Sequence, residues 1–357
     1  MVNINKRQKQ VQQSLLKDEL AVIEALEDSY EEAIAEIDGI IVSLLARKDT
    51  ENLQAIIYQV KQQKALKKEL EVLLKELQDN NYQTIDEYLK GCYENAHIGT
   101  LFDLQGQGVP LILPLDQEQM ISAITLNSKI SAPLYNHLGY NIDSLKVDIM
   151  REISRGIAMG LSYQEMARNL QNMTSVDFNK SLRIAKTEGH RIQNEATYNV
   201  QKRAIQRGAK IVKQWDSTLD KKTRKTHREL DGQVIGVDEY FVSLNGHKAL
   251  YPGDFGVASE DVNCRCQILQ RAEWAVGDGE LTKMNGFSGE LEHFASINDY
   301  NNFKKMFWSD ENIRYMNYVE TMEKRYETKD FKKVLTLMTD SEYKHYAELL
   351  DKTPIYK

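Results

Sequence analysis

The sequence predicts an α+β fold that is predominantly α. Apolar residues recur at three- and four-residue steps through the first half, short alternating segments and turn signals follow Gly208, and helical spacing returns near the end. We expect a long helical hairpin arm over residues 1–80 and a helical linker region over 81–147. A small α+β domain with short antiparallel strands over 148–273 and a helical C-terminal tail over 274–357 complete the expected organisation.

Composition places the chain among globular proteins. The 357 residues are 41% hydrophobic, which is sufficient for packed cores. The first ten residues lack the apolar stretch of a secretion signal, and the apolar runs over 40–46 and 109–115 are too short to cross a bilayer. An odd count of 3 cysteines without framework spacing favours reduced thiols. We therefore expect a soluble protein that stays in the cytoplasm where it is made, with no membrane contact.

The N-terminal arm is expected to consist of two long amphipathic helices. The first covers residues 5–47, and its apolar stripe includes Val11, Leu15, Val22, Leu26, Ala33, Ile37, Ile41 and Leu44. Thr50 is a suitable N-cap for the second, whose stripe includes Leu53, Ile57, Val60, Leu70, Leu73, Leu74 and Leu77. The two should pair as an antiparallel, coiled-coil hairpin. Periodicity alone leaves open whether this arm only buries its own seam or also docks another protein.

Shorter helices are expected beyond residue 80. Thr84 with Glu87 and Ser162 with Glu165 have the spacing of capping boxes, which mark helix starts. The stretch over 106–114 reads as a loop with a short strand, after which Asp116 can cap the next helix. A long helix should then extend over 174–208, with Gly208 in its stop position.

After Gly208 the pattern predicts strands over 210–216, 240–243 and 264–269 and a short helix over 223–230. Asn245-Gly246 and Tyr251-Pro-Gly-Asp254 are tight-turn signals. The tail should form helices over 299–307, 309–326 and 341–350.

A basic segment stands out within an acidic protein. Residues 180–228 contain 14 basic and 4 acidic residues, although the whole chain has a net charge of −7. Such a segment could follow the phosphates of double-stranded DNA, and the alternative is a solvated helix face. The candidate DNA-binding residues are Lys202, Arg203, Arg207, Lys210, Lys213, Lys221, Lys222, Arg224, Lys225 and Arg228.

The span from Trp215 to Cys266 concentrates residue types that can bind metal. His227, Cys264 and Cys266 could bind zinc, with His190, His247, Asp231 or Asp254 as a fourth ligand. In an extended strand, however, residues two apart are separated by roughly 6.6 Å. Thiolates on one zinc must lie within about 4 Å of each other. The expected strand therefore disfavours both zinc and a Cys264–Cys266 disulfide.

A cysteine-dependent enzyme is the second chemical alternative. Cys264 or Cys266 would be the nucleophile, His227 the base, and Asp231 or Asp254 the orienting carboxylate. Reactive cysteines favour helix N-termini or strongly positive surroundings, whereas these two lie in an expected strand. The favoured interpretation is structural, with buried thiols and with His227, Asp231 and Asp254 bonded to backbone groups. We expect no catalytic residue and no cofactor.

Five clusters in a fixed order resemble the phage head morphogenesis domain family, the minor head proteins that include protein F of phage Mu and gene product 7 of phage SPP1. The resemblance covers residues 148–273. A helix motif contains Thr187, Glu188 and Asn194, and Trp215 ends the strand that follows it. The remaining motif residues are Arg224, His227, Leu230, Asp231 and Gly232, then Tyr251, Pro252, Gly253 and Asp254, and finally Asn263, Cys264, Arg265 and Cys266.

This resemblance implies a non-enzymatic minor head (minor capsid) protein of a tailed phage or prophage. It would bind the portal protein at the portal vertex and act in procapsid assembly, with scaffold or major capsid protein and packaged DNA as further partners. Its location would be the virion, in the head interior or at the portal vertex, and the host cytoplasm during assembly. Some relatives carry a fused toxin or ADP-ribosyltransferase domain, but the roughly eighty residues after this domain show no catalytic signature.

Overall fold

A computed structural model describes residues 4–45, 53–109, 111–125, 147–148, 151, 163–276, 281–285, 287 and 291–353. The helices are α1 (Ile4–Leu45), α2 (Leu53–Gly106), α3 (Gln117–Thr125), α5 (Tyr163–Gln206), α6 (Lys225–Leu230), α7 (Ala258–Asp261), α8 (Ile297–Phe307), α9 (Asp310–Arg325), α10 (Phe331–Leu337) and α11 (Asp340–Lys352). The strands are β1 (Ile211–Asp216), β2 (Val234–Ile235), β3 (Phe241–Val242), β4 (Lys248–Ala249), β5 (Gln267–Ala272), β6 (Leu281–Met284) and β7 (Leu291–Phe294). This confirms an α+β fold that is predominantly α.

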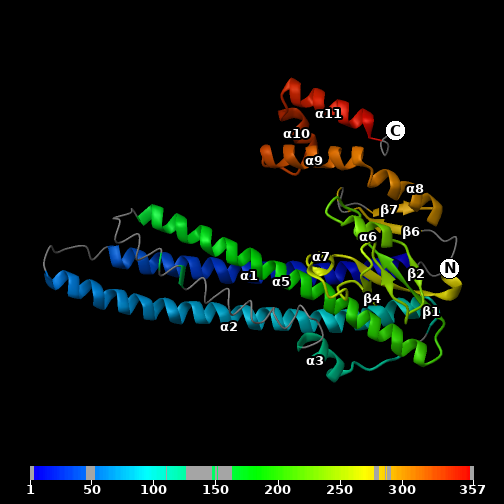
Figure 1. Cartoon of the computed structure of the whole chain (residues 1–357), viewed down its shortest axis with the longest axis horizontal. Helices are drawn as coiled ribbons and strands as arrows, with labels where there is room; N and C mark the ends of the chain where they lie inside the picture. Colours follow the sequence, from blue (N-terminus) through cyan, green and yellow to red (C-terminus); the bar gives the residue numbers. More distant parts are fainter. Residues whose placement is uncertain are drawn as a thin grey trace.

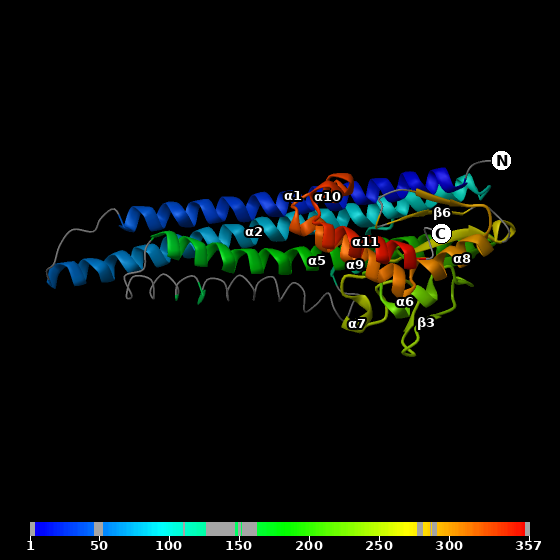
Figure 2. The same ribbon diagram turned by 90° about the horizontal axis from the view of Figure 1, so that it is seen from above.

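Three long helices form an elongated rod, with the strands gathered near the end that holds the N-terminus (Figure 1). Helices α1, α2 and α5 run alongside one another in both perpendicular views (Figure 2). The expected stripe of α1 is buried at Leu15, Val22, Leu26, Ala33 and Ile37. The N-terminal arm is therefore more than a two-helix hairpin, because α5 packs against both of its helices.

Helix α2 contradicts the expected break near residue 80. It continues from Leu53 to Gly106, so Thr84 lies inside a helix and caps nothing. Ile85, Leu89 and Cys92 carry the buried stripe onward at helical spacing, and their burial against α1 and α5 outweighs the local capping signal. The boundary expected between residues 80 and 81 falls within this helix.

Other local predictions have mixed outcomes. Asp116 accepts from the amide of Gln119 at 3.1 Å, as expected of a cap, and Gly208 has the expected positive φ of 86°. Helix α5 begins at Tyr163, well before the expected start at 174, and the described part of the loop over 106–116 contains no strand. Thr50 and Ser162 lie outside the described residues, as does most of 126–162.

Gly189 lies where α5 packs closely against Tyr88 of α2. A Cβ at this position would lie 2.7 and 2.9 Å from Cε1 and Cζ of Tyr88, whereas a Cβ at Gly91 of α2 would meet nothing within 4 Å. Alanine normally stabilises a helix by about 1 kcal/mol relative to glycine. At Gly189 the overlap with the Tyr88 ring should outweigh that gain, because overpacking costs about 1–3 kcal/mol.

We therefore expect Gly189→Ala to lower the free energy of unfolding by about 1–2 kcal/mol and Gly91→Ala to raise it by about 0.5–1 kcal/mol. Urea denaturation followed by circular dichroism measures both. Equal stabilisation by the two substitutions would show that the helices do not pack closely at Gly189.

The small sheet has the order β2-β1-β5 and is antiparallel throughout. Strand β5 pairs with β1 along its whole length, from Ile211 opposite Ala272 to Asp216 opposite Gln267. The side chain of Gln107, at the end of α2, binds the β5 backbone through Gln270 O at 3.0 Å and Ala272 N at 2.7 Å. This anchors the sheet to the rod.

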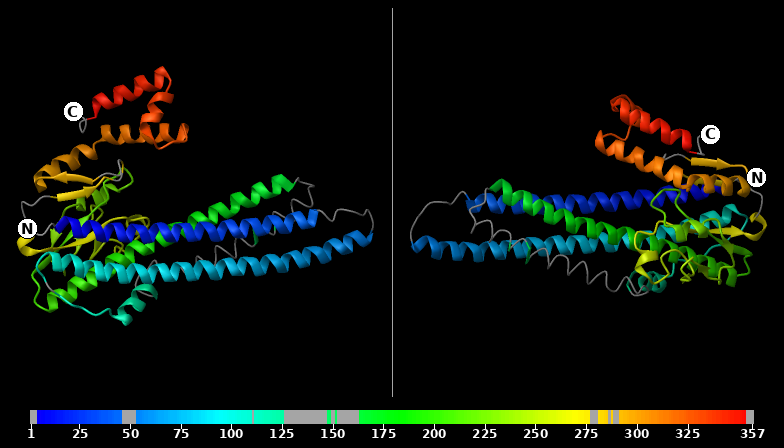
Figure 3. Two further views of the ribbon diagram at one scale, coloured as in Figure 1. Left: turned by 180° about the vertical axis from the view of Figure 1, so that it is seen from behind. Right: turned by 45° about the horizontal axis from the view of Figure 1, so that its top comes forward.

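The C-terminal tail contains more structure than expected. Helices α8, α9 and α11 agree with the three expected helices, but the hairpin of β6 and β7 and helix α10 carry no strong sequence signal. Helices α9, α10 and α11 stack beyond β6, β7 and α8 and stand clear of the rod (Figure 3). No helix in the described part of the chain is long and apolar enough to cross a membrane.

Candidate functional site

The helix motif and the closing motif bind each other directly. Asn194 on α5 donates from Nδ2 to the carbonyl oxygen of Cys266 at 3.0 Å and accepts from the amide of Ile268 at 2.8 Å. About two turns earlier on the same helix, Thr187 accepts from the amide of Asn263 at 3.0 Å. The two motifs are more than 70 residues apart in sequence, and they form one hydrogen-bonded unit that fixes the entry of the chain into β5.

Arg191 lies at the centre of a buried charge cluster on α5. Its guanidinium donates to Glu188 at 2.8 Å, to Glu195 at 2.6 Å and to the carbonyl oxygen of Ala123 at 2.8 Å. Burial opposes its charge, but the two carboxylates hold the pKa of Arg191 above its usual value. A Cβ on Gly253, where φ is +93°, would lie 3.1 Å from Cβ of Arg191. Glycine therefore suits both the turn and the contact.

Trp215 forms the core of the domain. Its side chain is fully buried, and its ring lies 5.0 Å from Phe241, 5.5 Å from His227 and 5.8 Å from Phe255 between centroids. Its Nε1 donates to Ser217 Oγ at 3.0 Å, and that hydroxyl donates to the carbonyl oxygen of His227 at 2.9 Å. The conspicuous tryptophan is thus a packing residue with its one polar atom satisfied.

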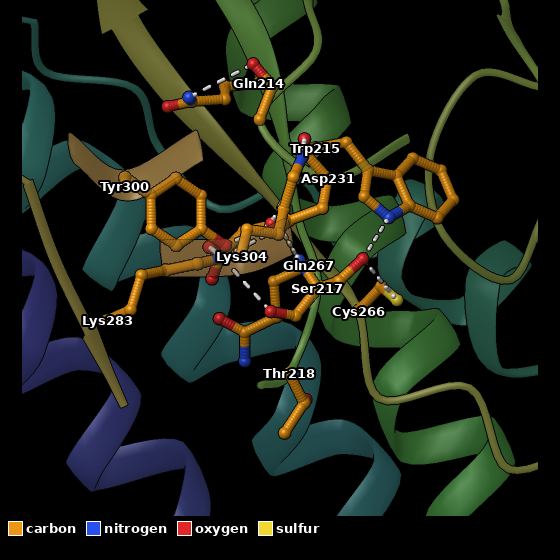
Figure 4. A network of polar contacts seen from close by, with 12 residues as sticks. Gln214, Trp215, Ser217, Thr218, Asp231, Cys266, Gln267, Lys283, Tyr300 and Lys304 are labelled. Atoms are coloured by element: carbon orange, nitrogen blue, oxygen red, sulfur yellow. Dashed lines mark hydrogen bonds and ion pairs between the residues drawn. The ribbon is translucent and has the colours of Figure 1, made fainter. Parts of the chain in front are cut away.

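Asp231 is bound by residues of the tail, as Figure 4 shows. Its Oδ1 accepts from the amide of Ser217 at 2.7 Å and from Lys283 Nζ at 2.9 Å, and its Oδ2 accepts from the Tyr300 hydroxyl. Lys304 Nζ donates to the backbone oxygen of Asp231 at 2.7 Å. These tail residues could not be predicted from the sequence, because nothing local links them to a residue 52 to 73 positions away.

Lys283 is the common partner of two buried carboxylates. Besides Asp231, its ammonium group pairs with Asp216 and donates to the backbone oxygen of Ser217 at 3.0 Å. Although burial opposes its charge, Asp216 and Asp231 hold the pKa of Lys283 well above its usual value. The tail is therefore connected to the domain by an ion-pair network without bulk water around it.

The thiols correct the expectation of a strand at Cys264. Strand β5 begins only at Gln267, and Asn263 has a φ of 55°, so the chain turns before the strand starts. His227 Nδ1 lies 3.6 Å from Cys264 Sγ and 3.3 Å from Cys266 Sγ, and the three atoms lie within 4.8 Å of one another. The expectation that Cys264 and Cys266 are held apart by strand geometry, which argued against a metal, was therefore wrong.

The other proposed ligands are occupied elsewhere. His190 pairs with Glu19 at 3.2 Å, Asp231 binds Lys283, and Asp254 accepts from the amide of Leu250 at 2.9 Å within its turn. His247 contacts a Glu260 oxygen at 3.3 Å. The turn role expected of Asp254 is thus confirmed.

The surroundings of the thiols give little support to a nucleophile. Both are buried, and a hydrogen bond with Cys266 together with burial raises the pKa of the Cys264 thiol. Burial also opposes ionisation of Cys266, but hydrogen bonding with Cys264, His227 and Ser217 lowers the pKa of this thiol well below its usual value. A cavity of about 460 Å³ lies beside Leu230, Asp231 and Tyr300, and neither thiol lines it.

Several candidate DNA-binding side chains bind other parts of the protein. Arg203 donates to the carbonyl oxygen of Pro114, Arg224 to that of Glu260 and Arg228 to that of Thr223. Lys221 pairs with Glu320 of the tail. The exposed members of the set are Lys202, Arg207, Lys210, Lys222 and Lys225.

Lys213 is a clear correction, because it is 0% exposed and cannot contact DNA. It donates to the carbonyl oxygen of Leu250 at 2.8 Å, and its Nζ lies 5.3 and 5.2 Å from the rings of Tyr198 and Phe241. Burial lowers the pKa of Lys213 to about 8.

This pKa predicts a pH dependence of stability. A lysine whose pKa is lower in the folded than in the unfolded chain binds fewer protons when folded, so stability should rise between pH 8 and about 10.5. Because the two rings favour the charged amine and partly offset the effect of burial, we expect the free energy of unfolding to rise by only on the order of 1–2 kcal/mol over this range. Lys213→Met should remove this rise in urea titrations, while Lys210→Met, an exposed neighbour, should keep it. Identical pH profiles for the two variants would contradict the assignment.

Comparisons with known proteins agree with these motifs. The family model described as "Phage Mu protein F like protein" matches residues 147–269. The chain is 36% identical over 226 residues to NAD(+)--arginine ADP-ribosyltransferase EFV of Enterococcus faecalis, which covers 61% of this chain and 44% of that protein. It is 32% identical over 144 residues to minor head protein GP7 of Bacillus phage SPP1, which covers 39% of this chain and 45% of that protein.

The matched regions span less than half the length of either relative. No solved structure matches the chain. The family match nevertheless coincides with the segment in which the helix motif, Trp215, the Asp231 motif and the closing motif bind one another. The central domain of this chain is therefore similar to the phage head morphogenesis family of Mu protein F-like proteins, over residues 147–269.

Proposed function

We propose that this protein is a structural minor head protein of a tailed phage or prophage, which binds the portal vertex and acts in head assembly. The observation that carries the proposal is the family match over the motif-bearing domain, together with the likeness to a minor head protein of phage SPP1. The geometry is consistent with this role, since most motif residues satisfy backbone groups or fill the core. The motif thus maintains a fold.

The rod of α1, α2 and α5 is the surface that we propose for docking on the portal. It projects away from the domain (Figures 1 and 2), and it exposes apolar side chains at Leu16, Leu20 and Val72, each more than half accessible. Long helices with accessible apolar residues suit helix-on-helix packing with another protein.

Co-expression of the full chain with the portal protein of the same phage tests this role. We expect the two to co-elute in size exclusion chromatography, and the major capsid protein of the same phage serves as the comparison partner. Separate elution of chain and portal at micromolar concentrations, with no portal-dependent incorporation into procapsids, would contradict the proposal.

DNA contact is the second part of the proposal, now restricted to the exposed basic residues. They fall into two groups, one at the end of α5 with Lys202, Arg207 and Lys210, and one at α6 with Lys222 and Lys225. Removing one phosphate-binding side chain should reduce the slope of log K against log salt by about 0.9. We expect neutralisation of one group by glutamine to weaken binding to a random duplex about tenfold at low salt.

The matched control neutralises exposed lysines of the tail, such as Lys332, Lys333 and Lys344. Fluorescence anisotropy at several salt concentrations gives both affinity and slope. If neither group changes them more than this control does, the basic segment is a solvated surface.

An enzymatic role is the alternative that one comparison favours, because a relative is named as an arginine-specific ADP-ribosyltransferase. Less than half of that relative aligns with this chain. We propose that this chain has no such activity. Incubation with labelled NAD and an arginine-containing acceptor should give no transfer above a buffer control. Time-dependent labelling proportional to protein concentration would establish the transferase instead.

A further inference from the structure

Three buried groups from two separate segments converge on one point. His227 comes from α6, while Cys264 and Cys266 flank Arg265 in the turn between α7 and β5. The side chains are 1%, 4% and 3% exposed. The positive φ of Asn263 and the bond from Cys264 N to Asp261 O at 3.1 Å fold the turn so that both thiols face the imidazole. The arrangement places two sulfurs and one ring nitrogen within 4.8 Å of each other.

The two nitrogen–sulfur distances match edges of a zinc coordination tetrahedron. With Zn–N bonds of about 2.0–2.1 Å and Zn–S bonds of about 2.3 Å, the nitrogen and each sulfur should be roughly 3.5 Å apart. The observed separations from His227 Nδ1 are 3.6 Å to Cys264 and 3.3 Å to Cys266. A set of two thiolates and one imidazole in tetrahedral geometry selects zinc among common divalent ions. We propose that His227, Cys264 and Cys266 bind one structural zinc ion.

The outer contacts of His227 have the arrangement of a metal-bound histidine. Its Nε2 lies 3.2 Å from a carboxylate oxygen of Glu260, without the alignment of a hydrogen bond. Glu260 is itself 1% exposed and accepts from the Thr226 hydroxyl at 2.8 Å. A carboxylate behind the imidazole directs the other ring nitrogen to the metal. Glu260 is therefore a positioning residue rather than a ligand.

The fourth position belongs to an oxygen, which we assign to a water molecule or to the Ser217 hydroxyl. Ser217 Oγ lies 3.4 Å from Cys266 Sγ and accepts a hydrogen bond from this thiol. Binding replaces two S–H bonds by two Zn–S bonds and releases two protons to solvent, so the two thiolates balance the charge of the ion.

The function of this zinc would be structural. All three ligands are buried, and none of them lines the cavity beside Asp231. The ion would instead connect α6 to the segment that leads into β5, next to the Trp215 core. It would stabilise the same contacts that the family motif makes with hydrogen bonds.

Metal analysis of the full-length chain tests the proposal. After purification under reducing conditions without chelator, inductively coupled plasma mass spectrometry should find about one zinc per chain. Cys264→Ser and Cys266→Ser should each weaken zinc binding by more than about 100-fold, and Glu260→Gln by about 10-fold. Cys92→Ala is the matched control, since Cys92 is a buried thiol in α2 remote from the cluster, and it should retain the metal.

A second measurement remains decisive if the cysteine variants do not fold. Cobalt added to the metal-free wild-type chain should give the visible bands of a tetrahedral site and a thiolate charge-transfer band, and zinc should displace both. Chelator should also lower the melting temperature of the wild type. A metal-free wild-type chain that binds neither ion tighter than about 10 µM would overturn the proposal, because structural zinc sites bind far more tightly. Equal binding by folded Cys264→Ser would overturn it as well.

Discussion

Lys283→Met is expected to lower the free energy of unfolding by about 3–5 kcal/mol, one of the two largest effects that we predict for a single substitution. The change leaves Asp216 and Asp231 without the ammonium group that lies between them. Both carboxylates are largely withdrawn from water, and their like charges would then repel. Methionine fills a similar volume, so the loss should reflect charge rather than a cavity.

Chemical denaturation followed by tryptophan fluorescence measures this effect, since Trp215 lies beside the network (Figure 4). Lys305→Met, an exposed lysine of α8, should change stability by less than about 0.5 kcal/mol. Adding Asp216→Asn and Asp231→Asn to Lys283→Met should recover part of the loss. If Lys283→Met lowered the free energy of unfolding no more than Lys305→Met does, the tail would not be connected to the domain through this network.

Arg191→Met is expected to cost about 3–5 kcal/mol for the same physical reason. Its guanidinium contacts Glu188, Glu195 and the backbone oxygen of Ala123 at 2.6–2.8 Å, and it is 3% exposed. Removal would leave two buried carboxylates on one face of α5 without this cation. Arg191→Lys should be intermediate, because an ammonium group cannot reproduce the forked contacts.

Thermal and urea unfolding of these variants provide the comparison, with Lys202→Met as an exposed control on the same helix. Adding Glu188→Gln and Glu195→Gln to Arg191→Met should recover part of the loss, because the two carboxylates then carry no charge. A loss that these additions leave unchanged would point to packing, and an unchanged stability of Arg191→Met itself would contradict the buried cluster.

Local signals in the sequence were sufficient for much of the central domain. Strand β1, helix α6 and the turns at Gly246 and Gly253 agree with the predictions, because β-branched runs, Asn-Gly and Pro-Gly act over a few residues. The helix stop at Gly208 is equally local. These features depend on backbone preferences that neighbouring residues determine.

The errors arise where tertiary contacts outweigh local preference. Thr84 resembles a helix start, but the apolar stripe of α2 continues past it into the rod. Cys264 and Cys266 read as part of a strand, but Asp261 and Asn263 turn the chain first. The expected strand therefore argued wrongly against a metal site, because strand spacing would have kept the two thiols too far apart to share one ion.

The tail shows what sequence patterns could not reveal. Lys283, Tyr300 and Lys304 look like ordinary residues of a polar segment, and only the folded chain brings them to Asp231. Of the basic segment, the chain itself occupies Lys213, Arg224 and Arg228. Composition reports charge, but it does not report which charges are already paired within the protein.

The proposed structural role at the portal is tested most directly by quantifying the chain in purified procapsids. Mass spectrometry would compare particles from an induced phage with particles made without the portal protein, using the major capsid protein as the internal standard. We predict a low, fixed copy number in portal-containing procapsids and none in portal-free particles. Equal amounts in both, or absence from both, would contradict the proposed role.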